Sequence, residues 1–352
     1  MSSGPRSVGG VSVVTPRYAL LAHDYGNIGD EIQSIAAEQF LPQVDAWVER
    51  EALHRPPAAI GGEYKLVLNG WFMSQPAHWP PHPLYRPLIT SFHLSSITSP
   101  ANRLRRSASE VLLTGENLAY LHRHAPIGAR DLWTQQRLSA AGVESDLSGC
   151  LTLTLGAPTQ RRRGNYLCLV DVPDDIVEAV RWRTDTPIVR LTHRSPAGMT
   201  AAQRRAHARR LLSLYAHARG VLTTRLHCAL PAVAFGTPVF LTWPESCLHR
   251  LLGLQSFLHH DLGGNGEATV AAFRPEQPGP NPDTHLACRE RLVRTVNDYI
   301  GGPAARRRTP LFPFMPVPLL GRDEEHALRE AQRHPAIPVP VGNLDALVAS
   351  DH

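Results

Sequence analysis

Two residue types that together bind anions and move protons lie two positions apart in the segment Thr223-Thr224-Arg225-Leu226-His227. An arginine binds a carboxylate or a phosphate through paired hydrogen bonds, and charged hydrogen bonds contribute about 1.5 to 3 kcal/mol each. A histidine beside it transfers protons near neutral pH. In an extended strand end Arg225 and His227 face the same side, and the short apolar helix expected after them favours an anion. The alternative interpretation is structural, with a capping arginine and a core histidine.

A second candidate is the glycine-rich turn Gly26-Asn27-Ile28-Gly29-Asp30, which follows the first apolar run of the chain. Its two glycines allow the backbone to turn tightly and approach a ligand, and the following helix offers free N–H groups. In the alternative interpretation Asn27 and Asp30 only cap that helix. For this motif alone, capping is the more common role.

Three more segments place polar or aromatic side chains near the ends of expected strands. Asp131 is a candidate helix cap, and Arg130 before it is a ligand-binding residue, a surface charge or the partner of Asp131. In Asn69-Gly70-Trp71 the tryptophan is either a platform for a sugar ring or a core side chain. His93 follows another strand. Ligands of doubly wound sheets bind beyond the carboxyl ends of the strands, so these residues join the candidates.

The elements that must position these residues alternate between short apolar runs and longer helical stretches, as in α/β proteins with parallel sheets. The expected strands are residues 17–23, 65–69, 88–92, 127–130, 152–155, 166–170, 188–192, 221–224 and 239–243. The expected helices are residues 30–40, 132–141, 175–183, 200–219, 226–235 and 285–299. The pattern predicts two α/β halves joined near residues 156–164, with a proline-rich tail and one short helix over residues 323–333.

The composition excludes several classes of protein. With 352 residues, 43% hydrophobic and 19% charged, the chain has the composition of a folded protein, and no apolar run is long enough to span a bilayer. The net charge of +5 comes with a single lysine, Lys65, and no dense basic stripe, so we do not expect nucleic-acid binding. Five scattered cysteines indicate free thiols in a reducing compartment, and we expect a cytoplasmic protein.

Several catalytic motifs are missing from the sequence. It contains no G-x-S-x-G, no G-x-x-x-x-G-K-[ST] and no G-x-G-x-x-G pattern, which argues against a serine hydrolase, a P-loop NTPase and an NAD enzyme. The run His259-His260-Asp261 has no third ligand at a suitable spacing, so we expect no metal site.

Taken in order, the motifs resemble the polysaccharide pyruvyl transferase family from about residue 18 to residue 300. The resemblance is carried by Asn27-Ile28-Gly29-Asp30, by Arg130-Asp131, and by Thr224-Arg225-Leu226-His227-Cys228-Ala229 ahead of Phe235-Gly236-Thr237-Pro238-Val239. Asn69-Gly70-Trp71 and Ser148-Gly149-Cys150-Leu151-Thr152-Leu153 resemble a bacterial branch of the family. The chain departs from the family at Gly149-Cys150, where many members carry Asp-Pro.

The resemblance implies an α/β fold of two Rossmann-like domains, residues 1–160 and 161–300, that face each other across a cleft as in GT-B glycosyltransferases. A proline-rich tail, residues 301–352, follows them. It also implies an activity in surface or exopolysaccharide biosynthesis, the transfer of pyruvate from phosphoenolpyruvate onto sugar hydroxyls as a cyclic ketal. Phosphoenolpyruvate is then the donor substrate, no bound cofactor is expected, and the acceptor is a sugar or glycan. A lipid-linked acceptor would bring the enzyme to the inner membrane surface.

Phosphoenolpyruvate carries two anionic groups, which we expect Arg130 and Arg225 to bind from the two halves. His227 is the candidate general acid/base, a role typically worth about 10² to 10⁴ in rate, and Asp30 orients it or accepts a proton. The other candidate substrate-binding residues are Asn27, Gly29, Asn69, Trp71 and His93. Two alternatives remain open, a GT-B-like glycosyltransferase that uses a nucleotide sugar and a non-catalytic sugar- or anion-binding relative.

Overall fold

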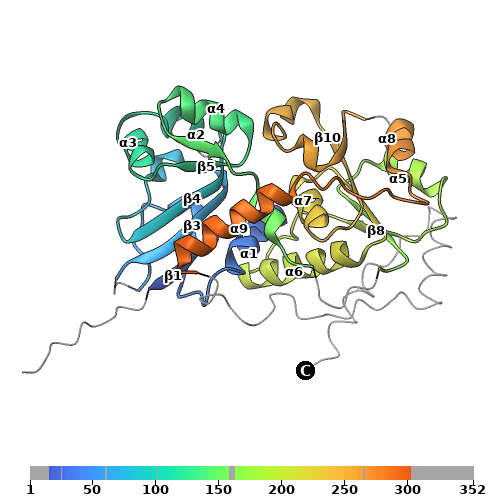
Figure 1. Ribbon diagram of the computed structural model, residues 1–352, viewed down its shortest axis with the longest axis horizontal. Helices are drawn as coiled ribbons and strands as arrows, with labels where there is room; N and C mark the ends of the chain where they lie inside the picture. Colours follow the sequence, from blue (N-terminus) through green and yellow to red (C-terminus); the bar gives the residue numbers. More distant parts are fainter. Residues whose placement is uncertain are drawn as a thin grey trace, which may run out of the picture.

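The chain folds into two parallel β-sheets with helices around them (Figure 1). The computed structural model describes residues 16–24, 26–59, 62–100, 102–157, 163–264 and 266–302. The first sheet contains β1 (Arg17–Ala22), β2 (Ala46–Glu49), β3 (Tyr64–Phe72), β4 (Tyr85–Leu94), β5 (Ile127–Ala129) and β6 (Ser145–Leu147). The second contains β7 (Leu167–Val170), β8 (Ile188–Leu191), β9 (Gly220–Thr223), β10 (Val239–Trp243) and β11 (His259–Leu262).

Both sheets contain the same order of five strands. The first runs β2-β1-β3-β4-β5-β6 and the second, read from its β8 edge, runs β8-β7-β9-β10-β11, so each begins with the 2-1-3-4-5 arrangement of doubly wound folds. In this arrangement the direction of strand progression reverses between the first and third strands, which are β1 and β3 in one sheet and β7 and β9 in the other. Ligands bind at such reversal points, beyond the carboxyl ends of the strands.

The helices surround the sheets and join the two halves. In the first half they are α1 (Ile28–Glu38), α2 (Ala108–Val111), α3 (Gly115–Arg123) and α4 (Leu132–Ala140). In the second half they are α5 (Asp174–Arg181), α6 (Ala201–His217), α7 (Leu226–Ala234) and α8 (Gly266–Phe273), followed by α9 (Leu286–Ile300). Short 3-10 helices are η1 (Arg50–Ala52), η2 (Pro76–His78), η3 (Leu151–Thr154), η4 (Glu245–Arg250) and η5 (Gln255–Phe257).

One apolar core extends through both halves. It includes the buried faces of α1, α6, α7 and α9 together with η3. Separate clusters fill the outer parts of the first and second sheets. Because the central core draws side chains from both halves, burial of apolar surface holds the halves together.

Helix α9 returns from the second half to the first, as Figure 1 shows. The Lys65 Nζ of β3 donates to the Tyr299 carbonyl at 2.7 Å, and the Arg291 Nη2 of α9 donates to the Leu147 carbonyl at 2.7 Å. The Cys288 Sγ lies against Gly149, which has a φ of +74°, and a Cβ on that glycine would lie 2.5 Å from the sulfur. This packing explains why a glycine is required at position 149.

Loops at the carboxyl ends of the strands connect the halves directly. The Ile28 N–H donates to the His193 carbonyl at 2.8 Å, and the Ser195 N–H donates to the Gly26 carbonyl at 2.8 Å. These bonds join the loop after β1 to the loop after β8. The Leu132 N–H donates to the Leu252 carbonyl at 2.9 Å, which joins the end of β5 to the segment after β10. The same ends of the two sheets therefore meet.

The structure confirms an α/β fold with two parallel sheets and corrects one expected strand. Residues 152–155 do not form a strand: the first three lie in the buried 3-10 helix η3 and Leu155 is its C-cap, and the Thr154 Oγ1 donates to the Leu151 carbonyl at 2.7 Å. An alternating apolar pattern over four residues does not distinguish these structures. The expected loop at residues 158–162 and the proline-rich tail with its helix over residues 323–333 lie outside the described residues. The domain boundaries at residues 160 and 300 remain predictions.

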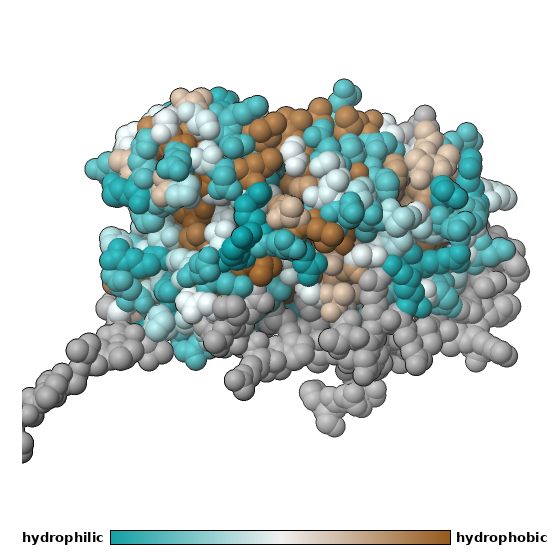
Figure 2. Space-filling model, in the orientation of Figure 1, coloured by the Kyte–Doolittle hydropathy of each residue, from teal (hydrophilic) through white to brown (hydrophobic). Residues whose placement is uncertain are grey.

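In the view of Figure 2, hydrophobic residues gather along the upper edge of the molecule, in the region where Figure 1 draws the segment after β10. None of the described helices is long and apolar enough to cross a membrane.

Candidate functional site

The candidate residues lie where the strands of both sheets end. Asn27, Gly29 and Asp30 follow β1, and Asn69 and Trp71 lie in the last part of β3. In β4, His93 is the penultimate residue, and Arg130 directly follows β5. In the second half Arg225 and His227 follow β9.

The expectation that Arg225 and His227 share an extended strand end is wrong. Strand β9 ends at Thr223, whose Oγ1 accepts from the Arg225 N–H at 2.9 Å and so closes the turn. Arg225 is the N-cap of α7, and His227 lies in the first turn of that helix. The two residues therefore do not share a strand face, and Arg225 binds a residue that the sequence analysis did not single out, Asp171.

Asp171 directly follows β7 and binds Arg225 at the reversal point of the second sheet. Its Oδ2 accepts from the Arg225 Nε at 2.7 Å and from the His193 N–H at 2.9 Å, and its Oδ1 accepts from the Thr192 hydroxyl at 2.6 Å. Burial alone would raise the pKa of Asp171, but the hydrogen bonds from Thr192 and His193 and the pairing with Arg225 lower it. The aspartate thereby fixes the guanidinium, whose side chain retains 36% exposure and can reach a ligand.

His227 is buried, and its Nε2 makes no hydrogen bond to any described residue. Burial lowers the pKa of His227 well below its usual value, the charges of Arg130 and Arg250 lower it further, and the charge of Asp30 opposes them. The imidazole is therefore neutral at pH 7. A neutral imidazole beside two guanidinium groups is ready to take up a proton when an anion arrives.

Arg130 is completely buried, so the surface-charge interpretation is wrong and the pairing interpretation is confirmed. Its Nε donates to the Asp131 Oδ2 at 3.3 Å. The Nη1 and Nη2 atoms are both buried and make no hydrogen bond within the described part of the chain. Buried polar groups are normally satisfied, and a guanidinium with two unsatisfied terminal nitrogens is a strong indication of an anion-binding site.

Asp131 connects Arg130 to His93 and caps α4. Its Oδ1 accepts from the Thr134 N–H at 3.0 Å, which confirms the capping interpretation, and its Oδ2 binds the His93 Nδ1 at 2.6 Å. Burial favours the neutral acid, but His93 with its hydrogen bond, and then Arg130, lower the pKa of Asp131 to about 2. Burial and the charge of Arg130 lower the pKa of His93 to about 3. His93 is thus a neutral donor that orients the carboxylate holding Arg130.

The turn after β1 both caps α1 and lies against His227. The Asn27 Oδ1 accepts from the Gly29 N–H at 3.1 Å, so the capping interpretation is confirmed for Asn27. Asp30 is buried and accepts from the Gln33 Nε2 at 3.0 Å, and its carboxylate forms an ion pair with Arg50 at 3.4 Å. No hydrogen bond joins Asp30 to His227 in the described residues, so its effect on the histidine is through its charge.

Asn69 and Trp71 lie beside this ion pair. The Asn69 Nδ2 donates to the Gln33 carbonyl at 2.9 Å, and its Oδ1 is buried without a described partner. The guanidinium of Arg50 lies 5.3 Å from the centre of the Trp71 ring. The indole is partly exposed, so part of it remains accessible beside this cation.

Sequence reasoning missed four residues of this region: Arg50, Asp171, His193 and Arg250. Asp171 and His193 lie just beyond expected strands, so the rule that ligands bind at carboxyl ends could have found them. Arg50 and Arg250 lie in 3-10 helices that the apolar pattern does not predict.

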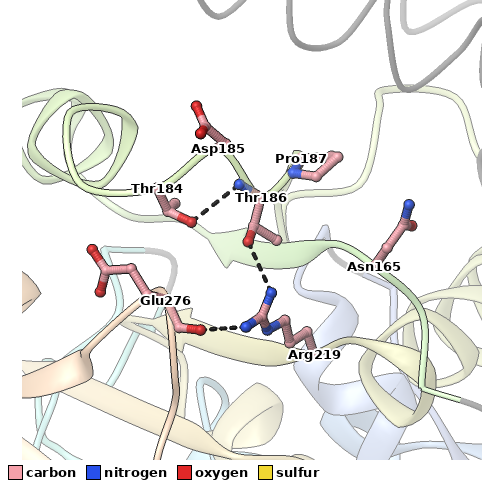
Figure 3. Close-up of a pocket in the computed structure, with 7 residues that line it drawn as sticks. All are labelled: Asn165, Thr184, Asp185, Thr186, Pro187, Arg219 and Glu276. Carbon is pink, nitrogen blue, oxygen red and sulfur yellow. Dashed lines mark hydrogen bonds between the residues drawn. The ribbon is translucent and has the colours of Figure 1, made fainter.

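A shallow pocket at the opposite edge of the second sheet is not this site (Figure 3). Asn165, Pro187 and Arg219 all precede strands there, and the Arg219 Nη1 donates to the Thr186 Oγ1 at 3.2 Å. The Arg219 Nη2 donates to the Glu276 carbonyl. The guanidinium is therefore already bound. Across the described residues no group of three or more His, Cys, Asp or Glu side chains could hold a metal ion.

Comparisons with known proteins agree with the expected family. No curated protein matches the chain significantly. Residues 118–246, the segment that contains Arg130, Asp131, Arg225 and His227, match the family model of polysaccharide pyruvyl transferase, which confirms the resemblance over this part of the chain.

Proposed function

We propose that this protein transfers pyruvate from phosphoenolpyruvate onto two hydroxyls of a sugar or glycan and forms a cyclic ketal. One observation carries the proposal. The two terminal nitrogens of Arg130 and the Nε2 of His227 are buried, lack partners among the described residues and act on each other electrostatically. A ligand that is both anionic and in need of a proton satisfies all three atoms.

The two halves supply different parts of the donor site in this proposal. Arg130 follows the first sheet and Arg225 the second, and phosphoenolpyruvate has a carboxylate and a phosphate to bind. We propose a GT-B-like arrangement in which the donor lies between two Rossmann-like domains, near the points where strand order reverses. Asp171 keeps the Arg225 guanidinium in place.

His227 supplies the proton for the first step. Donor binding adds negative charge beside the imidazole and raises its pKa, so His227 takes up a proton and delivers it to the methylene carbon. The cation at the adjacent carbon is attacked by one hydroxyl. The carbon–oxygen bond to phosphate then breaks, and the second hydroxyl attacks the same carbon. Each acceptor hydroxyl loses one proton. One of these protons replaces the proton that His227 gave to the methyl group, and the other leaves with phosphate.

The acceptor lies on the side of the first sheet in this proposal. Trp71 offers a ring face to a sugar, and the buried Asn69 Oδ1 can accept from a hydroxyl. Asp30 remains charged because Arg50, which pairs with it, offsets the effect of burial and lowers its pKa. It stabilises the protonated state of His227. The reaction takes place in the cytoplasm, and at the inner membrane surface when the acceptor is lipid-linked.

The proposal is tested by incubating the protein with phosphoenolpyruvate and a panel of free glycans and lipid-linked sugars. We expect release of phosphate together with one carboxyethylidene group on the acceptor, detected by mass spectrometry. Consumption of a nucleotide sugar without use of phosphoenolpyruvate would instead identify a glycosyltransferase. Binding of phosphoenolpyruvate without turnover on any acceptor would identify a non-catalytic relative.

A further inference from the structure

The segment after β10 carries an arginine from the second sheet to the candidate site. η4 ends at Arg250, and the chain continues to Leu252, whose carbonyl accepts the Leu132 N–H at the start of α4. Gly253 in this segment has a φ of +85°, and a Cβ there would lie 3.4 Å from the Leu132 nitrogen. The segment is therefore packed closely against the start of α4, which Asp131 caps.

Ring contacts of His249 confirm this position. Its ring lies 6.4 Å from the His93 ring and 5.4 Å from the Trp133 ring, measured between centres. His93 binds Asp131, which in turn binds Arg130. Arg250, the next residue along the chain, thus enters the neighbourhood of Arg130 from the opposite half of the molecule.

The guanidinium of Arg250 lies 5.9 Å from the centre of the buried Trp243 ring. Its Nε is buried and has no hydrogen-bond partner in the described ranges. Burial and then the charge of Arg130 lower the pKa of Arg250, and the charge of Arg250 in turn lowers the pKa of His227. Two guanidinium groups with unsatisfied buried nitrogens therefore lie close enough to repel each other.

Asp131 is the carboxylate that binds Arg130, and it is already hydrogen-bonded by His93 and Thr134. The two guanidinium groups of Arg130 and Arg250 carry two positive charges and Asp131 carries one negative charge, so one positive charge is in excess. A purely structural arginine would have its nitrogens satisfied. When His227 takes up its proton the excess rises to two positive charges, which a dianion balances, and the oxygens of a phosphoryl group accept hydrogen bonds from both guanidinium groups.

We infer that Arg130 and Arg250 together form a binding site for a dianionic phosphoryl group, held between the two halves of the molecule. The inference rests on the proposed function in one respect, since the natural phosphoryl group is then that of the donor. The carboxylate of the donor is then left for Arg225. His227 lies beside the phosphoryl group, whose negative charge raises the proton affinity of the imidazole.

The test measures binding of inorganic phosphate by calorimetry and by thermal shift, with pyruvate as the carboxylate probe. In Arg250→Gln we expect phosphate affinity to fall about 10- to 100-fold, the effect of losing a charged hydrogen bond. Pyruvate affinity should change less than about 3-fold. Arg289→Gln is the matched control, because Arg289 is a partly buried arginine of α9 whose Nη1 binds the Ala234 carbonyl.

A second readout separates a binding role from a structural one. Because Arg250 repels Arg130, the ligand-free Arg250→Gln variant should unfold at the same temperature as the wild type or a higher one. Phosphate affinity that is unchanged in Arg250→Gln, or undetectable in the wild type, would overturn the inference. Arg250-dependent phosphate binding by a protein that never turns over phosphoenolpyruvate would support the inference while refuting the proposed function.

Discussion

Gly29 and His227 lie so close together that a Cβ on Gly29 would be 3.1 Å from the Nδ1 of His227 and 3.3 Å from its Cβ. Gly29 belongs to the first half and His227 to the second. The imidazole is consequently positioned by the other half of the molecule, and position 29 controls where the ring can lie.

We predict that Gly29→Ala impairs catalysis more than stability. The added methyl group must displace the His227 ring by a few tenths of an ångström, and we expect kcat to fall about tenfold. Alanine is favoured over glycine within a helix by about 0.5 to 1 kcal/mol, which offsets part of the crowding. Steady-state kinetics and urea unfolding measure the two effects.

Gly156→Ala is the control for this substitution, because no described atom lies within 4 Å of a Cβ there. It should leave kcat unchanged. Full activity of Gly29→Ala would show that the position of the His227 ring does not limit the reaction.

We predict that donor binding is coupled to uptake of a proton by His227. The pKa of this histidine is depressed by burial and by Arg130 in the ligand-free protein, and phosphoenolpyruvate partly cancels the second effect. The affinity for the donor should therefore decrease as the pH rises above neutrality. Calorimetry in buffers of different ionisation enthalpy measures the proton uptake.

The control for this prediction is His227→Gln, which should bind phosphoenolpyruvate without proton uptake and lose about 10² to 10⁴ in kcat. Equal proton uptake by the wild type and the variant would assign the proton to another group.

We predict that Asp131→Asn strongly destabilises the protein. It leaves the buried Arg130 without its carboxylate, and removing one partner of a buried pair typically costs about 3 to 5 kcal/mol. The comparison is Asp174→Asn, which breaks the exposed pair with Arg190 and should cost less than about 1 kcal/mol. Similar urea midpoints for the two variants would contradict the importance of the buried pair.

We predict that the protein loses stability as the pH falls from 7 to 5. Burial lowers the pKa values of His23, His93 and His193 to about 3, whereas unfolded histidine titrates near 6.5. Between these values the unfolded chain binds more protons than the folded chain, so the free energy of unfolding falls as the pH falls, by about 2 kcal/mol per histidine between pH 7 and pH 5.

Urea unfolding at several pH values tests this directly. His193→Gln should unfold with a shallower pH dependence than the wild type, because its partner Tyr215 can still bind the amide. An identical pH dependence in this variant would mean that folding does not lower the pKa of His193.

The sequence predicted the sheets better than it predicted the site. Apolar runs such as residues 166–170 and 239–243 locate buried strands because a strand buried on both faces needs continuous apolar residues. β11 was missed because three of its four residues, His259, His260 and Asp261, are polar and the strand lies at the sheet edge. Arg130 and His227 were found because they follow strands within recognisable motifs. Arg250 was not, because its proximity to Arg130 arises only when the segment after β10 packs on α4.

The most direct test of the central claim is the thermal stability of the protein with millimolar phosphoenolpyruvate, compared with a panel of nucleotide sugars. A ligand at about 100 times its dissociation constant adds roughly 2.7 kcal/mol of stability. We predict that phosphoenolpyruvate raises the unfolding temperature of the wild type and of Arg289→Gln, and has no effect on Arg130→Gln or Arg225→Gln. An increase produced only by a nucleotide sugar, or one that persists in both site variants, would contradict the account.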